Sequence, residues 1–156
     1  MYELALFLHI ISAVAFFSGA VVAAVCHSRA RARASAAEVA ALLGAARVGA
    51  VLVMAGIAGV LLFGLWLVDV SGRSFVEGWL AASLALLVAA AALGALGGKT
   101  PRRARELAER LAGEGAGVGP ELRGLLDDRA SLWLNHAATA AGVVILALMV
   151  FKPGAG

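Results

Sequence analysis

Residues 4–26, LALFLHIISAVAFFSGAVVAAVC, decide the fold of this chain. They contain no Asp, Glu, Lys or Arg, and His9 is their one strongly polar ring. At about 1.5 Å of rise per residue, a helix of this length crosses a hydrocarbon core of about 30 Å, so we predict a transmembrane helix. An ionisable side chain inside such a helix is costly unless it has a partner or a function, which makes His9 the first candidate site residue.

Three further apolar segments predict three further spans. The four spans are expected at residues 4–26, 48–68, 75–96 and 131–151. The composition agrees, because 62% of the residues are hydrophobic and 15% are charged, whereas about a quarter of the residues are charged in soluble proteins. We therefore predict a single all-α transmembrane domain over residues 1–156, an integral membrane four-helix bundle. Its one cysteine, Cys26, excludes an internal disulfide.

The basic residues predict the orientation. Of the 13 Lys and Arg residues, four lie between the first two spans and seven between the last two. Because cytoplasmic loops are rich in Lys and Arg, segments 27–47 and 97–130 are predicted to be cytoplasmic, and the termini and the turn at 69–74 to face outward (N-out, C-out). Basic residues beside apolar segments are typical of contact with the lipid bilayer, and the lack of interleaved aromatic residues argues against nucleic acid.

The two cytoplasmic segments also carry helix signals. Ser35 and Glu38 have the spacing of a capping box, so the second helix should begin before the bilayer. Residues 101–112, PRRARELAERLA, place Leu107 and Leu111 on one side of a helix, which we predict to lie at the membrane surface between the third and fourth spans.

This surface helix is expected to end at a glycine-rich break. Its charges allow i, i+4 pairs of Arg102 with Glu106 and of Arg105 with Glu109. Residues 113–119 interrupt the pattern, and Pro120 is at the favoured first position of a new helix.

Small residues recur at a close-packing spacing in the second and third spans. Ala55 and Gly59 are four residues apart, as are Gly94 and Gly98, and this spacing lets helices approach closely. We expect packing within the chain's own bundle. A homo-oligomer or a partner in a membrane complex is the alternative that the spacing leaves open.

The face of the first span that contains His9 is small and partly polar. Ser12 and Phe16 follow His9 at i+3 and i+7, so the three side chains share that face. A flat cofactor needs a recessed face of this kind. A histidine that bonds to a hydroxyl or carbonyl of a neighbouring helix would give the same pattern, so both interpretations remain open.

The fourth span begins with a second polar group, Asn135, His136 and Thr139. Such clusters most often join helices. His9 and His136 are each expected about 7 Å inside opposite faces of the membrane, which leaves about 15 Å between them along its normal. One haem bound by both is therefore not expected, whereas a haem on one histidine, or two separate sites, remains open. His27 lies in the basic segment and is expected to be solvated.

The two ends of the chain resemble those of a group of small bacterial four-span membrane proteins. Residues 8–12, LHIIS, and 17–19, FSG, are similar to the opening of HemJ-type protoporphyrinogen oxidases and of the CopD-type copper-resistance domain. Arg129, Asn135 and the closing residues 151–153, FKP, are similar to their ending. The resemblance implies a four-span fold in the bacterial inner (plasma) membrane, and it implies that His9 is an axial ligand of haem b.

The chain departs from the oxidases at three places. They have an arginine near the inner end of the first span, where this chain has VVAAV at residues 21–25, and a lysine in the third span, where this chain has none. His136 stands where they have an acidic residue. The resemblance therefore implies an uncharacterised relative within the group, and protoporphyrinogen oxidation is not expected.

Three hypotheses of function follow. The first is binding of b-type haem, with His9 as the metal ligand and Ser12, Phe16, Asn135 and His136 as further cofactor-binding candidates, for electron transfer or porphyrin handling. The second is a non-catalytic structural or accessory membrane subunit that packs on a partner through its Gly and Ala faces. The third is copper handling, although the chain has only three Met and one Cys. No catalytic residue is predicted, since the sequence lacks a nucleophile elbow and paired carboxylates within the spans.

Overall fold

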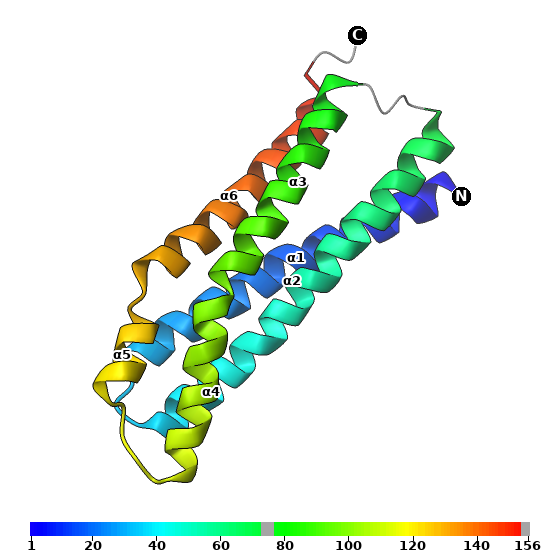
Figure 1. Ribbon diagram of the computed structural model, residues 1–156. Coiled ribbons are helices and arrows are strands. Elements are labelled where there is room, and N and C mark those ends of the chain that lie inside the picture. The colour runs from blue at the N-terminus through cyan, green and yellow to red at the C-terminus, as the bar shows by residue number, and fades with distance from the viewer. Residues whose placement is uncertain (73–76, 154–156) are drawn as a thin grey trace.

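The computed structural model describes residues 1–72 and 77–153, and within these ranges the chain is almost entirely helical. The helices are α1 (Tyr2–Arg31), α2 (Ala36–Ser71), α3 (Gly78–Gly97), α4 (Lys99–Gly113), α5 (Pro120–Leu126) and α6 (Arg129–Phe151). Figure 1 shows that α1 and α2 form one antiparallel hairpin, and that α6 runs beside α3. The all-α prediction is confirmed.

Four helical stretches are long and apolar enough to cross a membrane, as predicted. They are Tyr2–Arg31, Ala36–Ser71, Gly78–Gly113 and Pro120–Phe151. Large apolar side chains remain exposed along them, which is what a lipid-facing surface requires; Phe7, Val51, Val88 and Val150 are between 59% and 66% exposed. These four stretches are longer than the predicted spans, because polar residues continue them beyond the apolar segments.

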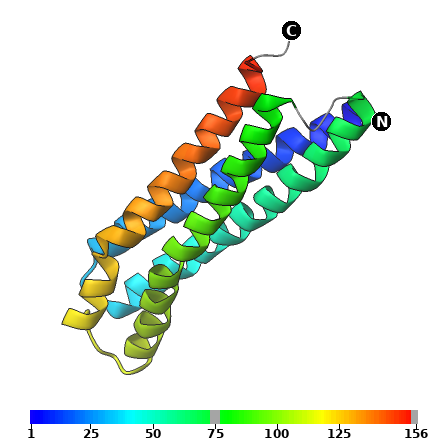
Figure 2. The same cartoon turned by 45° about the horizontal axis from the view of Figure 1, so that its top comes forward.

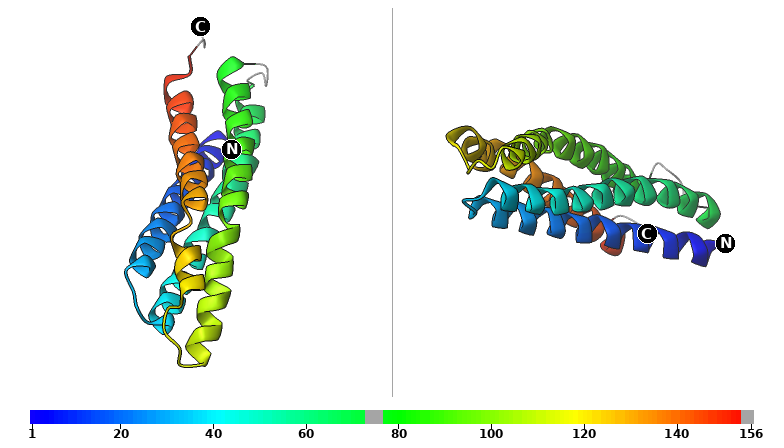
Figure 3. Two further views of the ribbon diagram at one scale, coloured as in Figure 1. Left: turned by 60° about the vertical axis from the view of Figure 1, so that its left-hand side comes forward. Right: turned by 90° about the horizontal axis from the view of Figure 1, so that it is seen from below.

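The bundle has two chemically different ends. The N-terminus, the end of α2, the start of α3 and the end of α6 gather at one, which we call the terminal end (Figure 2). The polar helices α4 and α5 gather at the other, which we call the basic end (Figure 3). The α1–α2 hairpin and the α3–α6 pair lie apart at the terminal end (Figures 1 and 2) and come together at the basic end.

The turn predicted at 69–74 is only partly within the described residues. Asp69 still belongs to α2, which ends at Ser71 and is followed by its C-cap residue Gly72 in a left-handed conformation with φ of 65°. Glycine adopts this conformation without the strain that a Cβ would cause. Residues 73–76 lie outside the described part of the chain, and so does the predicted start of the third span at 75.

The helix predicted at 101–112 is present as α4. It continues the direction of α3 (Figure 1) and packs against α2 and α5. Ala104 and Ala108, both fully buried, form its inner face and are small enough to allow this close approach. The predicted pairs are present, with Arg102 Nε 3.0 Å from Glu106 Oε1 and Arg105 Nη1 2.6 Å from Glu109 Oε1.

A hydrophobic core holds the basic end together. It contains buried side chains from α1, α2, α4 and α5, namely Ala30, Val39, Leu43, Ala104, Ala108, Leu122 and Leu126. Arg123 adds two hydrogen bonds at this end: its Nη1 donates to the Arg31 carbonyl at 2.6 Å and its Nη2 to the Arg33 carbonyl at 3.1 Å. The two segments predicted to be cytoplasmic, 27–47 and 97–130, therefore form one packed helical layer rather than two separate loops.

The helix starts at the basic end match the sequence signals in part. Ser35 is the N-cap residue of α2, but its side chain makes no capping bond, and Glu38 lies 3.8 Å from Arg33 instead. Pro120 opens α5 as predicted. The cap of α6 is Asp128, whose carboxylate accepts from the backbone N–H groups of Ala130 and Ser131.

Candidate functional site

Helices α1 and α2 pack along a seam of glycines. A Cβ on Gly19 would lie 2.5 Å from the Gly49 carbonyl oxygen, and one on Gly49 would lie 2.6 Å from the Gly19 carbonyl oxygen, so the two backbones touch. Gly56 leaves room for Phe16, whose Cα would be 2.7 Å from a Cβ there, and Gly59 leaves room for Ser12. The prediction that Gly59 serves packing within the bundle is confirmed.

The other members of the predicted small-residue pairs behave differently. Ala55 is exposed, and Gly94 has no atom within 4 Å of an added Cβ. A Cβ on Gly98 would meet only atoms of its own helix, whereas one on Gly97 would lie 3.0 Å from the Asn135 side chain. Close packing of α3 on α6 thus uses Gly97, and the expected packing within the bundle is not found at Gly94 or Gly98.

His9 lies in the seam, near the terminal end. Its Nδ1 is 3.1 Å from the Val60 carbonyl oxygen of α2, and a Cβ on Gly64 would lie 3.1 Å from its Cε1. The absence of a side chain on Gly64 therefore lets the imidazole ring reach the α2 backbone. Because a carbonyl oxygen can only accept, Nδ1 must donate, and a neutral His9 then keeps its lone pair on Nε2.

Ser12 and Phe16, the predicted neighbours of His9 on its helical face, do lie on that face, but α2 covers it. Ser12 is 8% exposed and donates from Oγ to the Leu8 carbonyl of its own helix at 2.7 Å. Phe16 fits against Gly56, as described above. The space between α1 and α2 is thus filled by packed side chains along this stretch.

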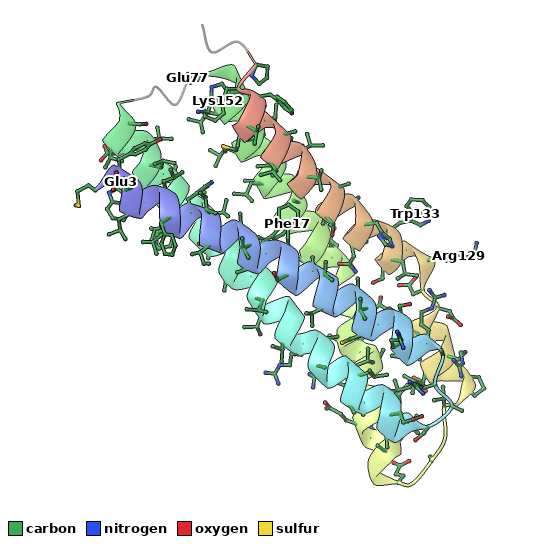
Figure 4. The ribbon with its side chains drawn as sticks, turned by 180° about the vertical axis from the view of Figure 1, so that it is seen from behind. Glu3, Phe17, Glu77, Arg129, Trp133 and Lys152 are labelled. Atoms are coloured by element: carbon green, nitrogen blue, oxygen red, sulfur yellow. The ribbon has the colours of Figure 1, made fainter. Side chains whose placement is uncertain are left out.

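Phe16 and Phe17 also connect the two halves of the bundle. A Cβ on Gly142 of α6 would lie 2.7 Å from Phe16 Cε1 and 3.7 Å from Phe17 Cε1, and the two phenyl rings pack edge to face at 5.0 Å. Figure 4 shows Phe17 between α1 and the helices behind it. His9 lies two turns from Phe16 toward the terminal end, where the halves separate.

The polar group at the start of α6 joins that helix to α3. Ser131 Oγ donates to the Gly97 carbonyl, and Asn135 Nδ2 donates to the same oxygen at 3.2 Å and to the Ser131 carbonyl at 2.9 Å. Thr139 Oγ1 donates to the Asn135 carbonyl at 3.0 Å. Asn135 thus has the helix-joining role that such clusters most often have.

Removing both donors to Gly97 should loosen α6 from α3. We expect the double variant Ser131→Ala/Asn135→Ala to lower the free energy of unfolding by about 1–3 kcal/mol, since each lost bond within a membrane protein is worth roughly 0.6–1.7 kcal/mol. Thr139→Val is the control, because Thr139 bonds only within α6. Unfolding in mixed detergent micelles measures both, and equal losses would contradict the assigned role.

The structure does not bring His136 to His9. His136 is exposed near the start of α6 and lines a surface groove at the basic end with Arg31, Arg129, Leu132 and Trp133. His27, expected to be solvated, is partly buried instead, and its Nε2 donates to the Leu126 carbonyl of α5 at 3.3 Å. In residues 1–72 and 77–153, no three side chains of His, Cys, Asp or Glu gather in a way that could hold a metal ion.

The four spanning stretches, their exposed apolar surface and the helical layer at one end define a four-span integral membrane protein. The chain belongs to the family of predicted integral membrane proteins DUF2269, which it matches over residues 3–153. The match covers the four spans and the polar helices between them. The resemblance to HemJ-type and CopD-type proteins stays a prediction. No curated protein and no solved structure matches the chain.

Proposed function

We propose that this protein binds haem b through His9 in the bacterial inner membrane, for electron transfer or porphyrin handling. The observation that supports this most is the hydrogen bond from His9 Nδ1 to the Val60 carbonyl. Histidines that bind metals usually donate their other ring N–H to a carbonyl or carboxylate, which fixes the tautomer and the ring orientation. The α2 backbone gives His9 this arrangement.

The second nitrogen of His9 makes no hydrogen bond and is not fully buried. Among the described residues, Nε2 makes no hydrogen bond, and every fully buried side-chain nitrogen or oxygen has a partner. Nε2 is therefore not sealed inside the seam. His9 belongs to the N-terminal part of α1, which reaches the terminal end, where the α1–α2 hairpin and the α3–α6 pair lie apart (Figures 1 and 2).

The candidate residues have different parts under this proposal. His9 would supply the axial ligand, and the iron would supply the redox chemistry. Val60 and Gly64 hold the imidazole, while Ser12 and Phe16 keep α1 against α2. Asn135 and His136 are near the basic end, so they do not belong to a site at His9.

A reduced-minus-oxidised absorption spectrum tests the proposal. The wild-type protein is expressed with ample haem supply, purified in detergent, and compared with His9→Ala and with His136→Ala as the matched control. We expect the b-type Soret and α bands in the wild type and in His136→Ala, and their loss in His9→Ala because only that variant lacks the ligand.

His9 also bonds to α2, so circular dichroism is needed to show that His9→Ala stays helical. Added imidazole should restore the bands in the folded variant if the lost group is a ligand. A colourless wild-type protein, or bands that persist in His9→Ala, would refute haem binding at this residue.

A second candidate function is a non-catalytic accessory subunit. It is favoured by α3, where Ala81, Ala85, Ala89 and Ala92 are exposed and Gly94 is open, since small residues let a neighbouring helix approach closely. Cross-linking in native membranes tests it. Under this hypothesis Gly94→Leu removes a cross-linked complex that His9→Ala leaves intact, and a chain that stays monomeric and uncross-linked refutes it.

A further inference from the structure

The groove that contains His136 lies where the apolar part of α6 meets the polar helices. It has a volume of about 370 Å³ and is lined by Arg31 at the end of α1 and by Arg129, Leu132, Trp133 and His136 on the first turns of α6. Figure 4 shows Arg129 and Trp133 projecting away from the bundle, so the groove faces the surroundings of the protein. The function proposed above does not use it.

The charge in this groove is positive and only partly compensated. Arg31 Nε donates to Asp127 Oδ1 at 2.9 Å, which fixes the guanidinium and neutralises part of its charge. The carboxylate of Asp128 accepts from the backbone N–H groups at the start of α6, where the positive end of the helix dipole offsets part of its negative charge. Arg129 has no ion pair in the described part of the chain, so its charge is available to an anion.

Along α6, the lining passes from the cationic Arg129 to the amphipathic side chains of Trp133 and His136. Arg129 comes first, Trp133 is about 6 Å further along the helix, and His136 about 10 Å further, at 1.5 Å per residue. Trp133 is 74% exposed, and tryptophan favours the boundary between headgroups and acyl chains. The apolar part of α6 follows. A phospholipid has the same order, with its phosphate first, then its ester groups, then its chains.

We infer that this groove binds the phosphate of an anionic phospholipid, with Arg129 and Arg31 at the phosphate and Trp133 beside the ester groups. A soluble phosphate would satisfy the two guanidinium groups equally well, but it would leave Trp133 and Leu132 uncovered. The combination of cations with an exposed indole therefore favours a lipid. Because anionic lipid is attracted to basic residues near a membrane surface, the site also ties the basic end to that surface.

Quenching of Trp133 by brominated lipids tests the inference. The full chain with Trp66→Phe and Trp79→Phe, shown to be helical by circular dichroism, retains one tryptophan. It is placed in phosphatidylcholine vesicles that contain an equal fraction of either brominated phosphatidylglycerol or brominated phosphatidylcholine. We expect phosphatidylglycerol to be enriched at Trp133 by about fivefold, the gain typical of one basic residue near the membrane.

Two variants distinguish a specific lipid-binding site from the non-specific attraction of anionic lipid to basic residues. Arg129→Gln should abolish the preference, whereas Arg103→Gln, which removes the same charge from α4 at the groove lined by Lys99, Arg102, Arg103 and Glu106, should keep it. Equal quenching by the two lipids in the parent protein, or equal losses in both variants, would overturn the inference. Displacement of phosphatidylglycerol by inorganic phosphate at constant ionic strength would overturn the lipid assignment in favour of a soluble phosphate.

Discussion

Gly49→Ala is expected to destabilise the folded protein by about 1–3 kcal/mol, the usual cost of forcing an extra methyl group into a packed interior. The new Cβ would lie 2.6 Å from the Gly19 carbonyl oxygen and 2.8 Å from the Ala23 backbone nitrogen. Backbone atoms cannot rotate away as a side chain can, so α1 and α2 must separate. Alanine is the better helix former by up to about 1 kcal/mol, which lessens the loss without reversing it.

The measurement is the unfolding free energy in mixed detergent micelles, followed by circular dichroism. Gly44→Ala is the matched control on the same helix, because a Cβ on Gly44 meets no atom within 4 Å. We expect Gly44→Ala to be neutral or slightly stabilising. If the two variants had the same free energy of unfolding, the contact between Gly19 and Gly49 would not contribute to the stability of the α1–α2 packing.

Leu122→Ala should have the largest effect at the basic end, with a loss of about 2–5 kcal/mol. Leu122 is fully buried in the core that joins α5 to α1, α2 and α4, and truncation leaves a cavity that helix backbones cannot readily fill. We expect α5 to detach before the spans unfold, because the affected contacts are confined to that end. In the wild-type protein the guanidinium of Arg123 bonds to the carbonyls of Arg31 and Arg33. Detachment of α5 should expose Arg123, and faster cleavage by trypsin at this residue would report it.

Leu62→Ala provides the comparison for this variant. Leu62 is 63% exposed on α2, so its removal leaves no internal cavity and should change neither stability nor cleavage appreciably. Cleavage of Leu122→Ala at the wild-type rate would show that the core does not hold α5 in place.

The four spans could be predicted from the sequence because length and apolar composition alone decide whether a segment can cross a membrane. The extents of the helices beyond the spans were partly predictable, as Ser35 and Pro120 show. The docking of α4 on α2 was not. Ala104 and Ala108 are unremarkable in a helical pattern, and only the three-dimensional position of α2 shows that they face a partner.

The candidate site was predictable to the level of a helical face. Spacing correctly placed His9, Ser12 and Phe16 together, since that follows from 3.6 residues per turn. It could not show which helix covers the face, because the register between α1 and α2 is set by contacts such as Gly59 with Ser12 that are remote in sequence. The Val60 carbonyl was unpredictable for a further reason, since every residue has one.

The structure also separates two polar residues that are adjacent in sequence. Asn135 turns toward α3 and His136 toward the surroundings, because neighbouring positions on a helix are about 100° apart. In the sequence, Asn135 and His136 belong to the same polar cluster. Their different contacts imply different roles, one in joining helices and one beside the basic groove.

Helix α2 is a single rod of 36 residues, about 54 Å long, in which one end carries the core beneath the spans and the other carries the carbonyl that holds His9. Such a rod is longer than the hydrocarbon core is thick, by about 24 Å. A change in its tilt must therefore move both ends in opposite directions at once. Long hydrophobic helices tilt when the bilayer is thinner, so a change of bilayer thickness that tilts α2 would displace the core at one end and His9 at the other together.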